Sequence, residues 1–102
     1  MKVVINRCYG GFGLSKKAIE MYCEKKAIDP GVWNEFGYYD NFYDGHIDRS
    51  DSDLIEIVEQ LGDKANGNCA NLTIVDVPDN VNWYISDYDG KEHVSEVHRT
   101  WY

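Results

Sequence analysis

A strand, a glycine loop and a helix follow one another at the start of this chain, and this junction constrains the fold most. Residues 2–6 (Lys-Val-Val-Ile-Asn) carry β-branched side chains that favour a strand. The run Gly10-Gly11-Phe12-Gly13 then interrupts the strand, and Ser15 is a favourable N-cap for a helix over residues 15–27, whose apolar residues recur at helical spacing. The sequence therefore predicts a β-loop-α unit whose helix start presents backbone N–H groups.

The start of this helix carries an unusual charge for its position. A helix N-terminus has partial positive charge and favours Asp or Glu, yet Lys16 and Lys17 lie in the first turn and Arg7 lies just upstream. We therefore expect a phosphate or carboxylate to bind here, although the glycine spacing fits neither a P-loop nor the dinucleotide fingerprint. An equally open alternative is that the glycines only allow a tight turn while Phe12 fills the core. The expected ligand-binding residues of this segment are Arg7, Tyr9, Gly10, Gly11, Phe12, Gly13, Ser15, Lys16 and Lys17.

The rest of the chain predicts a second helix and three more strands. Apolar residues at i, i+3, i+4 and i+7 indicate a helix over residues 50–62, capped by Ser50 or Asp51 and ended by Gly62 or Ala65. The β-rich runs at residues 72–77, 81–86 and 93–97 predict an antiparallel meander, with a hairpin turn at Asp89-Gly90.

These elements predict one small α/β (α+β) domain over residues 1–102, because a chain of 102 residues supports a single core. The expected order is β-α-α-β-β-β, with about four mainly antiparallel strands packed against two helices. Residues 28–49 alternate aromatic with acidic and small polar side chains without a helical or strand period, so we expect an aromatic, acidic loop there.

Composition limits the partners. The formal charge of −8 argues against DNA or RNA binding, which needs surfaces that neutralise phosphates. Aromatic residues make up 14% of the chain, eight of them tyrosine, which is more than so small a core needs. Exposed Tyr and Trp are typical of interfaces and of pockets for flat ligands, so we expect a homo-oligomer and a small ligand.

Neither a disulfide nor a metal or cofactor is expected. Cys8, Cys23 and Cys69 are odd in number and widely spaced, as in proteins with free thiols. The Asp-rich stretch at residues 40–51 fails the EF-hand pattern, because Phe42 stands where an oxygen ligand is required. The chain shows no signal peptide and no apolar run approaching ~20 residues, so we expect an intracellular protein that does not contact a membrane.

The C-terminal segment is a second candidate for ligand binding. His98, Arg99 and Trp101 place an imidazole, a guanidinium and an aromatic ring close together in the chain. Arg binds phosphate in a bidentate fork and Trp stacks on a base, so these residues suit a nucleotide. The alternative is an ordinary terminal strand. No nucleophile-base motif is recognisable, so binding is the simpler interpretation than catalysis.

Several segments together resemble a family of small uncharacterised phage and prophage proteins. They are residues 1–15 (MKVVINRCYGGFGLS), Leu61-Gly62, Ala65-Asn66-Gly67, Asp87-Tyr88-Asp89-Gly90 and His98-Arg99-Thr100-Trp101. The resemblance covers about two-thirds of the chain, and the aromatic middle is its variable part. It implies a phage protein acting in the host cytoplasm.

A phage origin suggests three functions. By analogy of type, small acidic phage proteins with a phosphate-friendly loop resemble sponges, which sequester nucleotide signals of bacterial immunity without turnover. A first alternative is an acidic inhibitor that uses the −8 surface and the aromatic loop to block a basic site on a host protein. A second is a nucleotide-processing enzyme with His98 as acid or base and Arg99 on the phosphate.

Overall fold

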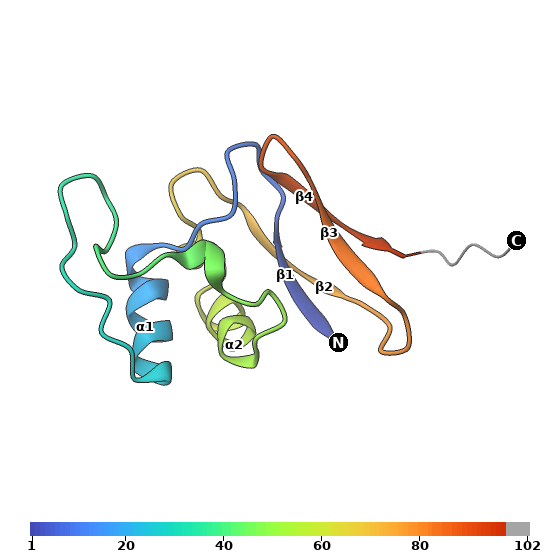
Figure 1. The fold of residues 1–102 in the computed structure, drawn as a ribbon, viewed down its shortest axis with the longest axis horizontal. Helices are drawn as coiled ribbons and strands as arrows, with labels where there is room; N and C mark the ends of the chain where they lie inside the picture. Colours follow the sequence, from blue (N-terminus) through green and yellow to red (C-terminus); the bar gives the residue numbers. More distant parts are fainter. Residues whose placement is uncertain (98–102) are drawn as a thin grey trace, which may run out of the picture.

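Two helices and two pairs of antiparallel strands form an α+β fold in the computed structural model, which describes residues 1–97 (Figure 1). The expected order β-α-α-β-β-β is confirmed. In chain order the elements are β1 (Lys2–Asn6), α1 (Lys16–Lys26), the 3₁₀ turn η1 (Asp44–His46), α2 (Ser52–Leu61), the 3₁₀ turn η2 (Gly62–Ala65), β2 (Leu72–Asp76), β3 (Trp83–Tyr88) and β4 (Lys91–Glu96). None of the helices in residues 1–97 is long and apolar enough to cross a bilayer.

The strands pair differently from the expected meander. β1 pairs with β2, and β3 pairs with β4, so the four strands form two two-stranded sheets. The predicted hairpin turn is confirmed: Asp89 and Gly90 have φ of 51° and 88°, as a tight turn between antiparallel strands requires. No hairpin joins β2 to β3, because the link over residues 77–82 contains Pro78 and the N–H of Val77 donates to the carbonyl oxygen of Met1 (2.7 Å).

Both helices begin where their caps are predicted. The hydroxyl of Ser15 accepts the N–H of Ala18 (3.2 Å), and the carboxylate of Asp51, rather than Ser50, caps α2. At its other end α1 closes on Ala27, which takes a left-handed φ of 55° while its N–H bonds back to the last turn. Helix α2 ends at Gly62 and passes into η2.

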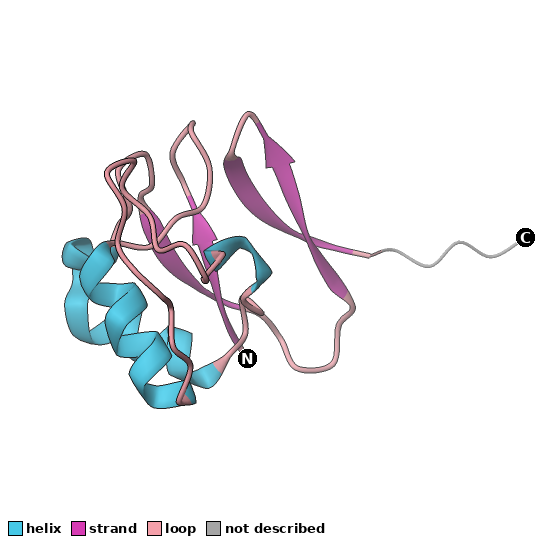
Figure 2. Ribbon diagram, turned by 60° about the vertical axis from the view of Figure 1, so that its left-hand side comes forward, coloured by secondary structure: helices cyan, strands magenta, loops and turns pink. Residues whose placement is uncertain are grey.

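The β1–β2 pair forms a middle layer with the helices on one face and the hairpin on the other (Figure 2). Alternating side chains of β1 therefore enter different cores. Val4 packs with the helices, whereas Val3 and Ile5 pack with Val77 beneath the β3–β4 hairpin.

A buried polar network attaches the hairpin to β1. The carboxylate of Glu92 accepts the N–H of Asn6 (2.7 Å) and a bidentate pair of bonds from Arg49 (2.6 and 2.9 Å). The guanidinium of Arg49 also stacks 3.6 Å from the centre of the Phe12 ring. The amide of Asn6 donates to the carbonyl of Gly90 (2.6 Å), so side chains link the two sheets where no ladder of backbone bonds does.

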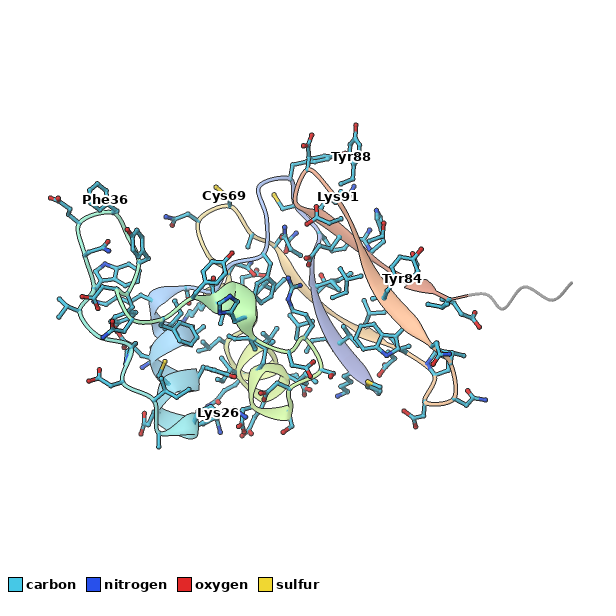
Figure 3. All side chains as sticks on the ribbon, viewed as in Figure 1. Lys26, Phe36, Cys69, Tyr84, Tyr88 and Lys91 are labelled. Atoms are coloured by element: carbon cyan, nitrogen blue, oxygen red, sulfur yellow. The ribbon has the colours of Figure 1, made fainter. Side chains whose placement is uncertain are left out.

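Residues 28–49 form the expected irregular segment, and part of it folds back on itself. We name residues 30–41 the aromatic arm. Backbone bonds join its two sides, from Asp40 to Val32 (3.1 Å) and from Asn41 to Pro30 (2.9 Å). Phe36 lies at its tip, at the end of the molecule away from Tyr88 on the hairpin (Figure 3).

Candidate functional site

Glycines in three loops, Gly10, Gly67 and Gly90, allow these loops to pack closely against one another. A Cβ on Gly10 would lie 2.7 Å from the Cβ of Cys69, and one on Gly67 would lie 2.9 Å from the carbonyl carbon of Gly13. A Cβ on Gly90 would collide with the backbone nitrogen of Gly11. Glycine is therefore required at these positions by the neighbouring backbone, as in the tight-turn alternative.

Several N–H groups of the loop already bond within the chain. The N–H of Gly10 donates to the carbonyl of Asp89 (3.1 Å), and that of Ser15 donates to the carbonyl of Ala65 (2.8 Å). The N–H of Leu14 donates to the carboxylate of Asp44 (2.9 Å). The carboxylate of Asp44 thus occupies part of this loop as an internal anion. The backbone N–H groups available to a ligand lie further along the chain, in the first turn of α1.

The residues expected to form one site lie in two places. The N–H of Arg7 bonds to Asn71 beyond the end of β1, and the ring of Tyr9 lies 5.4 Å from the ammonium of Lys91 on the hairpin. Gly10 and Gly11 lie against the hairpin turn as well. Gly13, Ser15, Lys16 and Lys17 lead into α1 instead, with Phe12 between the two groups beneath Arg49.

A hollow of ≈ 190 Å³ opens at the start of α1. Lys16 lies on its rim with its ammonium 5.4 Å from the centre of the Trp33 ring, which belongs to the aromatic arm. Asn66 accepts the N–H of Leu72 through its side-chain oxygen, which leaves its NH₂ group as a donor. The lining residues are Leu14, Ser15, Lys16, Trp33, Gly37, Asn66, Gly67 and Asn68.

A second hollow of ≈ 370 Å³ adjoins the first, because both are lined by Leu14 and Gly37. Its walls are mainly apolar and aromatic, with the carboxylate-bearing Asp44 at one side. The lining residues are Leu14, Ile19, Gly37, Tyr38, Phe42, Tyr43 and Asp44. The aromatic arm therefore contributes to both hollows.

The lysines at the two ends of α1 differ in whether they form ion pairs. Near the C-terminus Lys25 pairs with Glu56 (3.3 Å), and Lys26 pairs with Asp51 and Asp53 (both 3.0 Å) on α2. Near the N-terminus neither Lys16 nor Lys17 forms an ion pair with any carboxylate of residues 1–97, and nor does Lys64. The backbone of Lys64 lies at the same place, since its carbonyl accepts the hydroxyl of Ser15 (2.7 Å).

We name these three residues, Lys16, Lys17 and Lys64, the lysine patch. Its members are exposed and their backbones lie next to Ser15, the cap of α1, in a protein whose formal charge is −8. The first turn of α1 contains no acidic residue to balance the helix dipole. The lysine patch is consequently the part of the described chain best suited to a small anion.

Other reactive groups add little to this site. Burial raises the pKa of the Cys23 thiol, and a thiol held protonated is a poor nucleophile. Across residues 1–97 no three His, Cys, Asp or Glu side chains are grouped so as to hold a metal ion.

The C-terminal candidates His98, Arg99 and Trp101 lie outside the described residues. The last described residue, Val97, donates its N–H to the carbonyl of Asn82 (2.8 Å). Val97 directly follows β4, whose six residues span roughly 17 Å. It therefore lies at the end of the strand opposite the turn at Asp89-Gly90.

Sequence reasoning found Lys16 and Lys17 but missed the residues around them. Lys64, Asn66 and Asn68 come from a turn about 50 residues later in the chain, and no local pattern connects them to α1. Trp33 was seen only as part of an irregular loop. Comparisons with known protein families, curated proteins and solved structures find no match.

Proposed function

We propose that this protein binds a small, phosphate-bearing nucleotide at the start of α1 and holds it without turning it over. The observation that carries the proposal is the lysine patch: three lysines that form no ion pair within residues 1–97, next to a helix N-terminus in an acidic protein. Charged hydrogen bonds from Lys16 and Lys17, together with the backbone N–H groups of the first turn, suit a phosphate.

Each hollow holds a different part of the ligand. The first, at ≈ 190 Å³, is smaller than the usual small-molecule pocket of about 300–1,000 Å³, so it takes the phosphate and sugar. The base extends past Gly37 into the second hollow, where Tyr38, Phe42 and Tyr43 offer aromatic surface. Trp33 and the amide groups of Asn66 and Asn68 line the passage for the sugar.

The biological role follows from the resemblance to phage proteins. A phage protein that holds a nucleotide tightly in the host cytoplasm would sequester a nucleotide signal of bacterial immunity. Tight binding without turnover needs stacking and phosphate contacts but no reactive group at the scissile bond, and the lysines, amides and aromatic rings of this site fit that requirement.

Release of bound ligand tests the proposal directly. The purified protein is incubated with a mixture of nucleotides, washed, denatured and analysed by mass spectrometry. We expect an intact nucleotide to be released. A processed product would instead indicate an enzyme, and no nucleotide at all would contradict the proposal and favour the acidic protein-binding inhibitor.

A matched pair of variants locates the site on α1. Lys16→Gln should weaken binding of the released nucleotide about ten- to a hundredfold, since a hydrogen bond to a charged group contributes roughly 1.5–3 kcal/mol. Lys25→Gln removes the same charge from the other end of the helix and should leave affinity unchanged. Equal losses in the two variants would contradict a site at the lysine patch.

A further inference from the structure

The tip of the aromatic arm exposes large apolar side chains to solvent. Phe36 is 75% exposed, Val32 69% and Tyr38 54%. The rings of Phe36 and Tyr38 stack on each other with their centroids 6.4 Å apart. Large exposed apolar side chains that pack on each other, as Phe36 and Tyr38 do, are typical of an interaction surface.

The tip is also held in one shape before any contact is made. The side-chain oxygen of Asn34 accepts the N–H groups of Phe36 (2.9 Å) and Tyr38 (3.3 Å), and the N–H of Gly37 donates to the backbone carbonyl of Asn34 (3.2 Å). The rings of Trp33 and Tyr39 pack edge to face at the base of the tip, with their centroids 5.0 Å apart. A surface that is already ordered loses less entropy on binding.

Charge decides what this arm can contact. The aromatic arm, residues 30–41, contains two acidic residues, Glu35 and Asp40, and no Lys or Arg. Two arms packed tip to tip would bring Glu35 of each copy together, so a contacting surface with positive charge is favoured over a second tip. On this chain the lysine patch offers that charge, because Lys16 and Lys17 form no ion pair within residues 1–97.

An unfilled apolar hollow lies next to that charge. The hollow of ≈ 370 Å³ is walled by Leu14, Ile19 and Phe42. Lys16 precedes Ile19 by three residues on α1, so the two share one face of the helix. Lys16 lines the adjoining hollow, and the carboxylate of Asp44 on the wall of this one is bonded to the N–H of Leu14. An aromatic ring matches the apolar walls and a carboxylate next to that ring matches Lys16, and Phe36 follows Glu35 directly.

We propose that two copies of this chain exchange aromatic arms about a two-fold axis. Phe36 of each copy fills the hollow walled by Leu14, Ile19 and Phe42 in the other copy, while Glu35 faces Lys16 across the rim. The arm and the hollow are adjacent on one surface, as a self-complementary two-fold interface requires. A buried aromatic anchor with a charged rim is the usual composition of a specific interface.

This dimer uses Lys16 and the same ≈ 370 Å³ hollow as the base in the proposed nucleotide site, so Phe36 of the other copy and the base compete for that hollow. The dimer itself needs no ligand and is tested without one. Sedimentation equilibrium of the purified chain up to about 100 µM should give twice the chain mass of 11.8 kDa. Phe36→Asp should weaken association at least about thirtyfold, as expected for an interface hot spot. Tyr88→Asp alters an equally exposed aromatic residue on the hairpin and should leave the dimer intact.

Charge exchange tests the rim contact. Glu35→Lys and Lys16→Glu should each weaken association about tenfold, and the double variant should restore it because every copy again presents opposite charges. Circular dichroism checks that each variant is folded. A monomer at 100 µM would overturn the proposal, as would equal effects of Phe36→Asp and Tyr88→Asp or a double variant weaker than both single variants. A chain that dimerises in this way, yet binds no nucleotide even when it is diluted to the monomer, would contradict only the proposed function.

Discussion

The helical side of the molecule and the β3–β4 hairpin are held to the middle layer by different forces. Between α1, α2 and the β1–β2 pair, twelve buried side chains form one continuous apolar core. Beneath the hairpin the fully buried apolar cluster has three members within residues 1–97, Val3, Ile5 and Val77. The hairpin packs on this cluster through the partly buried Trp83, Ile85 and Val94. It is also attached by the polar network of Asn6, Arg49 and Glu92.

This difference shows where directional bonds are needed. Apolar packing on the helical side fixes α1 and α2 through many non-directional contacts, so no single polar group is essential there. The hairpin lacks a backbone ladder to β1, and the carboxylate of Glu92 replaces that ladder by accepting from both Asn6 and Arg49. A few polar groups therefore decide whether the hairpin turn stays against the glycine loop.

The largest effect is expected from Glu92→Ala. The variant leaves the largely buried guanidinium of Arg49, whose side chain is 16% exposed, without its carboxylate, and breaking a buried pair costs about 3–5 kcal/mol of unfolding free energy. Urea denaturation measures the loss. Glu96→Ala, on the exposed end of the same strand, should stay within about 0.5 kcal/mol of the parent. A loss below 1 kcal/mol for Glu92→Ala would mean that apolar contacts alone hold the hairpin.

The Asp51 cap and ion pair on the helical side should contribute less to the unfolding free energy. Asp51→Ala removes the cap of α2 and one partner of Lys26, for which we expect a loss of about 0.5–2 kcal/mol at pH 7. Burial raises the pKa of Asp51, but bonds from Lys26 and from the N–H groups of Asp53 and Leu54 outweigh it, so the net pKa is lowered.

The pH dependence of that loss has a definite sign. Because the pKa of Asp51 is lower in the folded state, its stabilisation is present above the unfolded pKa of about 3.9 and disappears as pH falls through the folded value. The difference between parent and Asp51→Ala in thermal unfolding should therefore narrow below about pH 4. A difference that stays constant from pH 7 to pH 3 would contradict this role.

The smallest effect is a gain in stability. Ala27 ends α1 in the left-handed region with φ of 55°, where a Cβ is unfavourable and glycine is the usual residue. Ala27→Gly should raise the unfolding free energy by a few tenths to about 1 kcal/mol, measurable as a higher melting temperature. It should not alter nucleotide affinity, since it lies at the opposite end of α1 from the lysine patch. A lower melting temperature would show that unfolded-state entropy outweighs the strain.

Local signals in the sequence predicted the elements well. Ser15, Asp51 and the turn at Asp89-Gly90 act on residues only a few positions away, so their roles are visible in a single stretch of chain. The left-handed end at Ala27 was not predicted, because alanine gives no signal for that conformation and tertiary packing imposes it.

Long-range polar contacts were not predictable in the same way. Asp44 bonds to Leu14 across 30 positions, and Glu92 bonds to Asn6 across 86. Nothing in the local pattern distinguishes these carboxylates from the other acidic residues of the chain. The same limit explains why β2 was expected beside β3, since the choice of β1 as its partner depends on the whole fold. It also explains the site, where Lys64 and Trp33 join α1 only in three dimensions.

One measurement shows most directly whether a ligand binds on the helical side or near the hairpin. An amide NMR titration of the labelled protein with AMP reports on every backbone N–H at once. We expect shifts at Lys16 and Lys17 and at the indole N–H of Trp33, with the amides of Tyr9 and Lys91 unchanged. Shifts confined to Tyr9 and Lys91, or none at millimolar AMP, would contradict the claim that the lysine patch at the start of α1 is a nucleotide site.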